Sequence, residues 1–86
     1  NITGYAVVEA TPNGPKLLEA GVVRGKTKGS LTARLAEIHE GIQDVLGTFN
    51  PSVMALEQLF SHYQRPRTAI IMGHARGVIC LAAAQR

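Results

Sequence analysis

The sequence predicts an α/β domain in which a β-hairpin, a helix, a buried strand and a second helix follow one another along 86 residues. Three observations lead to this prediction. Two short apolar runs at the N-terminus flank a cluster of turn residues, two longer segments carry apolar residues at helical spacing, and a short unbroken apolar run lies between those segments. Sheet and helical segments therefore alternate, as they do in α/β folds. The length allows one small domain.

The hairpin is predicted from Thr3–Ala10 and Lys16–Arg24. The Asn13-Gly14 pair between these segments is a strong hairpin signal, while a proline on each side of it favours a longer loop. Because two antiparallel strands alone are only marginally stable, we expect the hairpin to belong to a larger sheet.

A first helix is predicted after Ser30, which is a suitable N-cap residue. We expect Gly47 to end this helix and Gly41, inside it, to mark a close approach to a neighbour. The apolar positions fall on one stripe: Leu31, Leu35, Ile38, Ile42, Val45 and Leu46. The polar residues Glu37, Glu40, Gln43 and Asp44 fall elsewhere, and we expect them to be solvated.

The most informative stretch is Val53–Leu56, an apolar run that directly precedes Glu57. Such a run is typical of a strand buried on both faces, and α/β sheets keep their sites at the carboxyl ends of strands. A carboxylate at this place suits a hard divalent cation. Alternatively, Glu57 lies in solvent or pairs with a nearby arginine. The sequence contains five other acids. Glu9 and Glu19 fall on the hairpin and the other three on the first helix, so none is expected beside Glu57.

A second helix is predicted after Thr68, with Thr68 as its cap. One face carries Ile71, Ala75, Val78 and Ala82, and small residues at Gly73, Gly77 and Ala84 would let another helix pack closely. We expect Cys80, the single cysteine, to pack as a small hydrophobe in a protein of the reducing cytoplasm.

The formal net charge is +3, and five of the nine basic residues form two clusters, namely Arg24, Lys26, Lys28 and Arg65, Arg67. Clustered cations suit a polyanion, and a solvated face fits equally well. Phe60 and Tyr63 accompany the second cluster, and aromatic rings beside cations suit unstacked bases and phosphates.

Several function classes are excluded. The segment Gly25–Ser30 lacks the spacing of a phosphate-binding loop, and the sequence contains neither a GxSxG nor a CxxC motif. No signal-peptide pattern and no apolar run of membrane length is present.

The order of the residues resembles the RuvC-type Holliday junction resolvases. The resemblance rests on TGYAVVE, AGVVRGKTKGSLTARLAEIHEGIQDVL, ALEQLF and GHARGVICLAAA, and covers the amino-terminal half of a typical member. It implies that residues 1–86 are part of a ribonuclease H-like nuclease domain with a mixed sheet and helices packed on it. We expect the strand between the hairpin and Val53–Leu56, with a first catalytic aspartate, to lie upstream of Asn1, and further acids to lie beyond Arg86.

The resemblance also implies a function. Members act as homodimers on four-way DNA junctions, use Mg²⁺ (or Mn²⁺) held by carboxylates, and work with junction-binding and branch-migration proteins. By position, Glu57 corresponds to a catalytic, metal-binding carboxylate and Phe60 to an aromatic that contacts bases. The loop with Tyr63, Arg65 and Arg67 resembles the DNA-facing loop, and Lys26 is a further candidate DNA contact. The segment alone is expected to be inactive.

Three alternatives stay open at this point. The chain could be a non-catalytic nucleic-acid-binding or dimerisation module of the same fold. It could be half of an actin-like or sugar-kinase ATPase, although its glycine-rich loop matches those poorly. It could also be another ribonuclease H-like nuclease, which would share Glu57 and lack the GHARGV helix.

Overall fold

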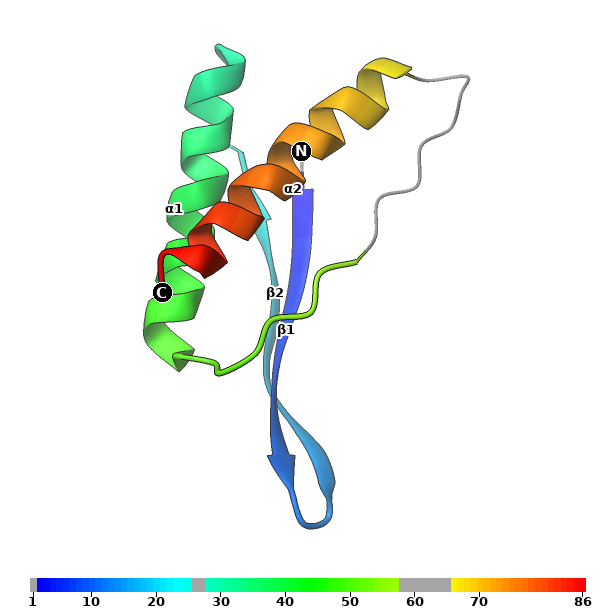
Figure 1. Ribbon diagram of the computed structural model, residues 1–86, viewed down its shortest axis with the longest axis vertical. Coiled ribbons are helices and arrows are strands. Elements are labelled where there is room, and N and C mark those ends of the chain that lie inside the picture. Colours follow the sequence, from blue (N-terminus) through cyan, green and yellow to red (C-terminus); the bar gives the residue numbers. More distant parts are fainter. Residues whose placement is uncertain (1, 26–27, 58–65) are drawn as a thin grey trace.

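The computed structural model describes residues 2–25, 28–57 and 66–86 and contains two strands and two helices in these ranges. In chain order they are β1 (Ile2–Thr11), β2 (Gly14–Arg24), α1 (Leu31–Phe49) and α2 (Pro66–Ala84). The helices lie beside one end of the β1–β2 hairpin, and the turn of the hairpin extends beyond them (Figure 1). The core therefore lies at the helical end of the molecule.

The hairpin turns more tightly than the flanking prolines suggested. Thr11 pairs with Gly14, so only Pro12 and Asn13 lie outside the ladder, and the prediction of a longer loop is wrong. Gly14 has a φ of +107°, a conformation open to glycine, and its carbonyl accepts a hydrogen bond from Thr11 Oγ1. The register shifts by one residue after Val7, which leaves Leu18 as the extra residue of a bulge.

Helix α1 begins as the sequence predicts. The Ser30 hydroxyl accepts a hydrogen bond from the Ala33 amide at 3.2 Å, which satisfies one of the free amides of the first turn. The helix ends later than predicted, because it continues through Gly47 to Phe49. Asn50 closes it in the left-handed conformation, with its amide 2.8 Å from the Leu46 carbonyl oxygen.

The core is small and joins β2, α1 and α2. Its buried residues are Val23, Ile38, Ile42, Leu46, Ile79 and Ala82. The predicted apolar stripe of α1 thus supplies half of them. The expected close approach at Gly41 is confirmed, because a Cβ placed there would lie 2.5 Å from Cγ1 of Val23.

The predicted buried strand Val53–Leu56 is not a strand in this structure. The sheet of the described residues contains only β1 and β2, antiparallel, so the predicted mixed sheet is not seen there. A strand exists only through pairing with a neighbour, and this segment has none in the described sheet. Val53 is 82% exposed, whereas Leu56 is half-buried against the core.

Helix α2 begins at Pro66, so the predicted cap at Thr68 is wrong. Proline suits the first turn of a helix, where its missing amide costs no hydrogen bond. The predicted face of α2 is confirmed, because Ala82 is buried and Ala75 and Val78 pack half-buried against the core, which Ile79 also joins. Cys80 is exposed and does not pack as predicted.

Candidate functional site

Glu57 is an exposed residue at the end of the segment 51–57, which connects α1 to the part of the chain before α2. Its neighbour Leu56 packs against the core. Its backbone carbonyl oxygen accepts a hydrogen bond from Nε of Arg76 in α2, at 3.3 Å. Residues of α2 therefore lie beside the segment that carries this carboxylate.

The other predicted site residues divide into two groups. Arg67 is exposed in the first turn of α2. Lys26, Phe60, Tyr63 and Arg65 lie outside the described residues. Of the predicted site residues, the structure therefore describes Glu57 and Arg67.

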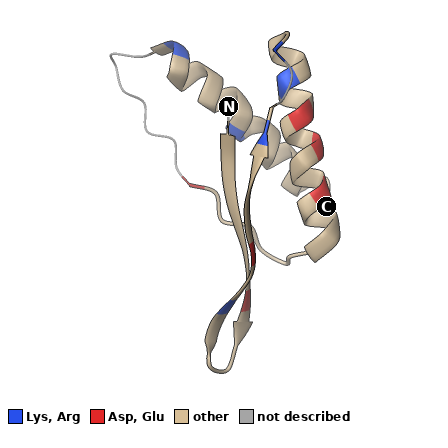
Figure 2. Cartoon of the chain, turned by 180° about the vertical axis from the view of Figure 1, so that it is seen from behind, with Lys and Arg blue, Asp and Glu red and all other residues tan. Residues whose placement is uncertain are grey.

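Lysine and arginine positions occur at the end of β2 and near the start of each helix, toward the end of the molecule that lies opposite the hairpin turn (Figure 2). Arg24 is the last residue of β2, Lys28 precedes α1, and Arg34 and Arg67 lie in the first turns of α1 and α2. The described members of the two basic clusters, Arg24, Lys28 and Arg67, therefore lie toward the same end of the molecule, and clustered cations suit a polyanionic ligand.

The carboxylates do not form a metal site within the described ranges. No group of three or more His, Cys, Asp or Glu side chains gathers there. Glu57 is one oxygen ligand of the kind that Mg²⁺ uses, and a divalent ion needs more than one protein group or substrate oxygen. The described residues thus supply a partial ligand set, and no reaction step through a metal follows from them.

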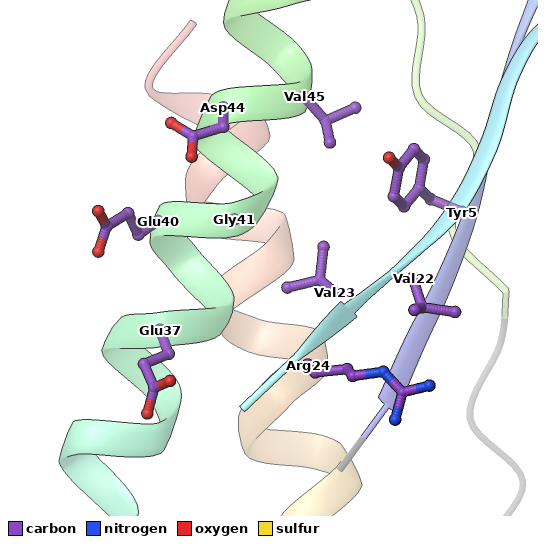
Figure 3. A pocket seen from close by; sticks show the side chains of 9 residues that line it. All are labelled: Tyr5, Val22, Val23, Arg24, Glu37, Glu40, Gly41, Asp44 and Val45. Carbon is purple, nitrogen blue, oxygen red and sulfur yellow. The ribbon is translucent and has the colours of Figure 1, made fainter. Parts of the chain in front are cut away.

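A shallow groove of about 370 Å³ runs between β2 and α1 (Figure 3). Tyr5, Val22 and Arg24 come from the sheet, and three acids come from α1. The lining acids are Glu37, Glu40 and Asp44. We predicted a solvated face for these acids, and Glu40 and Asp44 are exposed, whereas Glu37 is half-buried. Glu40 and Asp44 project from the side of α1 that faces away from β2 (Figure 3).

Tyr5 stands on the sheet side of this groove and is tied to its own hairpin. Its hydroxyl donates a hydrogen bond to Oε2 of Glu19 at 2.7 Å. This bond, together with desolvation and the Glu19 charge, raises the pKa of the Tyr5 phenol above its ordinary value. The phenol therefore stays protonated at neutral pH, where it acts as a hydrogen-bond donor.

Polar contacts join α1 to the two residues that follow α2. Nε2 of His39 lies 3.0 Å from Oε1 of Gln85, and Nε of Arg86 donates to Oε1 of Gln43 at 3.3 Å. These bonds tie the C-terminal end of the chain to α1. Neither α1 nor α2 is long and apolar enough to span a membrane, within the ranges the structure describes.

Comparison with known proteins adds the family. The family description "Crossover junction endodeoxyribonuclease RuvC" matches residues 1–86. A protein of that name from Rhodopirellula baltica is 58% identical over 86 residues, which are 98% of this chain and 47% of the relative. Relatives of the same name from Rhodospirillum rubrum and Desulforamulus reducens are 41% and 37% identical over 83 residues, which are 96% of this chain and 48% and 50% of those proteins.

The chain thus spans about half the length of the curated relatives it matches. The family match covers all of its residues, including Glu57 and both basic clusters. By this match, the chain belongs to the RuvC family of crossover junction endodeoxyribonucleases.

Proposed function

We propose that a full-length protein carrying this sequence is a structure-selective endonuclease that resolves four-way (Holliday) DNA junctions during recombination and repair. The observation that carries the proposal is the family match over residues 1–86, which includes the exposed carboxylate Glu57 and both basic clusters of the sequence. The 86-residue chain alone is proposed to be inactive, because its described part supplies one candidate catalytic carboxylate without a cluster around it.

In this proposal Glu57 is a catalytic carboxylate that binds Mg²⁺, with Mn²⁺ as a possible substitute. When bound, such an ion activates water and stabilises the developing charge on phosphate oxygens. The contribution of this chain is to present Glu57 to solvent at the end of a segment that Leu56 anchors to the core. The exposed carboxylate leaves its oxygens accessible to an ion and to DNA.

The proposed DNA contacts are Lys26, Phe60, Tyr63, Arg65 and Arg67. Arg67 supports this assignment, because it is exposed in the first turn of α2. Lysine and arginine would bind the phosphates, and the aromatic rings would stack on bases opened at the junction. Changing Arg65 and Arg67 together to Ala should weaken junction binding and reduce the slope of log K against log salt by about 0.9 for each lost phosphate contact. An unchanged slope would mean that both residues are solvated surface residues and do not bind DNA phosphates.

We also propose that the active protein is a homodimer joined through α2. The outward side of α2 supports this, because Ile70, Gly77, Leu81 and Ala84 recur there at helical spacing and are exposed. A Cβ at Gly77 would meet nothing within 4 Å, so a bulky residue there would fit the monomer. Gly77→Leu should therefore leave the fold intact and dissociate the dimer in analytical ultracentrifugation. A dimer of unchanged strength would exclude this side of α2 as the interface.

The proposal includes junction-binding and branch-migration proteins as partners and the cytoplasm as the location. The partners come from the family resemblance, and the location comes from the single free cysteine, Cys80, which suits a reducing compartment.

The function is tested with full-length protein on a labelled four-way junction and on linear duplex of the same sequence. Wild-type protein should cut the junction in two strands when Mg²⁺ is added and should leave the duplex intact. Glu57→Gln, which keeps the size and removes the charge, should abolish cutting while junction binding persists. Binding without cutting by the wild type would instead support the non-catalytic module, and cutting by Glu57→Gln would remove this residue from the mechanism.

A further inference from the structure

The segment 51–57 lies along α2 although no strand of the described sheet pairs with it. Near its start it faces a small cavity of about 130 Å³ that it shares with the ends of both helices. The lining residues are Leu46, Pro51, Ser52, Val53, Met54, Ala83 and Arg86. At its end, Glu57 meets Arg76, one residue before Gly77 in α2. The segment and α2 therefore run in opposite directions beside each other.

We propose that Arg76 is a positioning residue that holds Glu57 in place for the proposed reaction. This inference rests on the proposed function of Glu57 and goes beyond it by assigning a role to a second residue. Leu56 fixes the segment through its apolar side chain, and Arg76 fixes the next residue through the 3.3 Å bond from Nε to the Glu57 carbonyl oxygen. Two successive residues are thus anchored, one by packing and one by a hydrogen bond.

The choice of atom matters for the chemistry. A hydrogen bond to the carbonyl fixes the orientation of the Glu57 peptide unit and with it the direction in which the side chain leaves the backbone. An ion pair with the carboxylate would instead compete with a metal ion for the same oxygens. Because Arg76 uses the backbone oxygen, the Glu57 side chain remains exposed.

The position of Arg76 on its helix also suits this role. Arg76 is half-buried and lies between the side of α2 that packs on the core, at Ile79, and the exposed side at Gly77. A helix held by core packing is a firmer support than a loop, and catalytic groups need supporting residues that fix them to within fractions of an ångström. The guanidinium is planar and carries several donors, so its direction is well defined once one bond forms.

The test uses full-length protein and two kinds of variant. Arg76→Met keeps much of the aliphatic stem and removes every donor, while Arg76→Lys keeps a positive donor. Lys16→Met is the matched control, because it also removes a cation, and Lys16 is exposed on β2, outside the contacts described above for residues 51–57. All three are compared for backbone ¹⁵N order parameters of residues 56 and 57 without metal, for junction affinity, and for the rate of a single round of cutting.

Arg76→Met should lower the order parameters of residues 56 and 57 from the rigid range, about 0.85, toward the flexible range, below about 0.6. It should slow cutting by up to about 10²-fold, since misplacement by about 1 Å has that effect, with junction affinity unchanged. Arg76→Lys should restore part of both, and Lys16→Met should change neither.

Equal order parameters of residues 56 and 57 in Arg76→Met and wild-type protein would overturn the positioning role whatever the cutting rate. A slower rate that came entirely from weaker junction binding would also overturn it, because Arg76 would then be a DNA contact. A wild-type protein that binds junctions without cutting them would refute the proposed nuclease function instead, so the two failures are distinguishable.

Discussion

Helices α1 and α2 have the same length, 19 residues, and pack against each other, but they distribute their apolar residues differently. In α1 the buried residues Ile38, Ile42 and Leu46 form one stripe, and the charged residues Glu37, Glu40 and Asp44 fall outside it. In α2 the buried residues are Ile79 and Ala82, while Ile70 and Leu81 are 61% and 52% exposed. A helix with one apolar stripe buries its apolar surface on one side, whereas α2 has exposed apolar residues on a second side.

This difference separates the roles of the two helices. Helix α1 meets β2 on one side and α2 on another, and its polar side lines a groove. Helix α2 meets the core, the segment that ends at Glu57, and, in our proposal, a second copy of the protein. The contacts proposed for catalysis and assembly therefore fall on α2, and α1 holds it in place.

The largest expected effect compares one apolar residue from each helix. Ile42→Ala removes a buried side chain of α1 and should lower the free energy of unfolding by about 2–5 kcal/mol, the usual range for such a truncation. Leu81→Ala truncates an exposed side chain of α2 and should change it by less than about 0.5 kcal/mol in the monomer. Urea denaturation of full-length variants at low protein concentration measures both.

A similar loss in the free energy of unfolding for the two variants would contradict the difference between the helices. A loss at Leu81 that grows with protein concentration would sharpen it, because it would show that the exposed side of α2 is covered in an oligomer.

A smaller effect compares two glycines of α1. At Gly41 an added Cβ would lie 2.5 Å from Cγ1 of Val23, a buried β-branched side chain that cannot easily turn away. Overpacking of this kind costs about 1–3 kcal/mol, which exceeds the gain of about 1 kcal/mol in helix propensity from Gly to Ala. Gly41→Ala should therefore destabilise the protein.

At Gly47 the nearest atom to an added Cβ is Nη2 of Arg86, at 2.8 Å, the far end of a flexible side chain. Gly47→Ala should thus keep the propensity gain and stabilise by up to about 1 kcal/mol. Thermal denaturation of both variants decides the matter: a stabilised Gly41→Ala would mean that α1 does not fit tightly against β2.

The smallest effect concerns the sheet side of the groove beside α1. Because the hydrogen bond to Glu19 raises the pKa of Tyr5, its stabilisation is present below the ordinary tyrosine pKa and is lost as pH rises through the raised value. Glu19→Gln should move the Tyr5 titration, followed by ultraviolet absorbance of the phenolate, to lower pH. Tyr5→Phe identifies which transition belongs to this residue. Identical titration curves for Glu19→Gln and wild type would mean that Glu19 does not raise the pKa of Tyr5.

The parts of the fold that the sequence predicted are those fixed by local chemistry. Ser30 caps α1 because its hydroxyl meets an amide within its own first turn, and Gly41 marks the contact with Val23 because no side chain fits there. The hairpin follows from two alternating segments around Asn13-Gly14. Each of these depends on residues close in the sequence or on a single tight contact.

The parts that could not be predicted depend on distant partners. Val53–Leu56 has the composition of a buried strand, but a strand forms only where another strand pairs with it, and the described sheet offers β1 and β2 alone. Cys80 and Ile79 are adjacent in an apolar helix, so only the position of α1 decides which is buried. For the same reason the bond from Arg76 to the Glu57 carbonyl left no signal in the sequence, since nothing local links a helix residue to a backbone oxygen 19 positions earlier.

The central claim is that Glu57 is a metal-holding carboxylate, and Mn²⁺ binding to full-length protein in the absence of DNA tests it most directly. Glu40→Gln is the matched control, because Glu40 is an exposed acid on α1 away from this segment. We predict that calorimetric titration shows Mn²⁺ binding to wild type and to Glu40→Gln, and binding to Glu57→Gln that is weaker by on the order of tenfold or more, since a carboxylate is one of the few protein ligands of such an ion. Equal Mn²⁺ affinity in Glu57→Gln and wild type would contradict the claim.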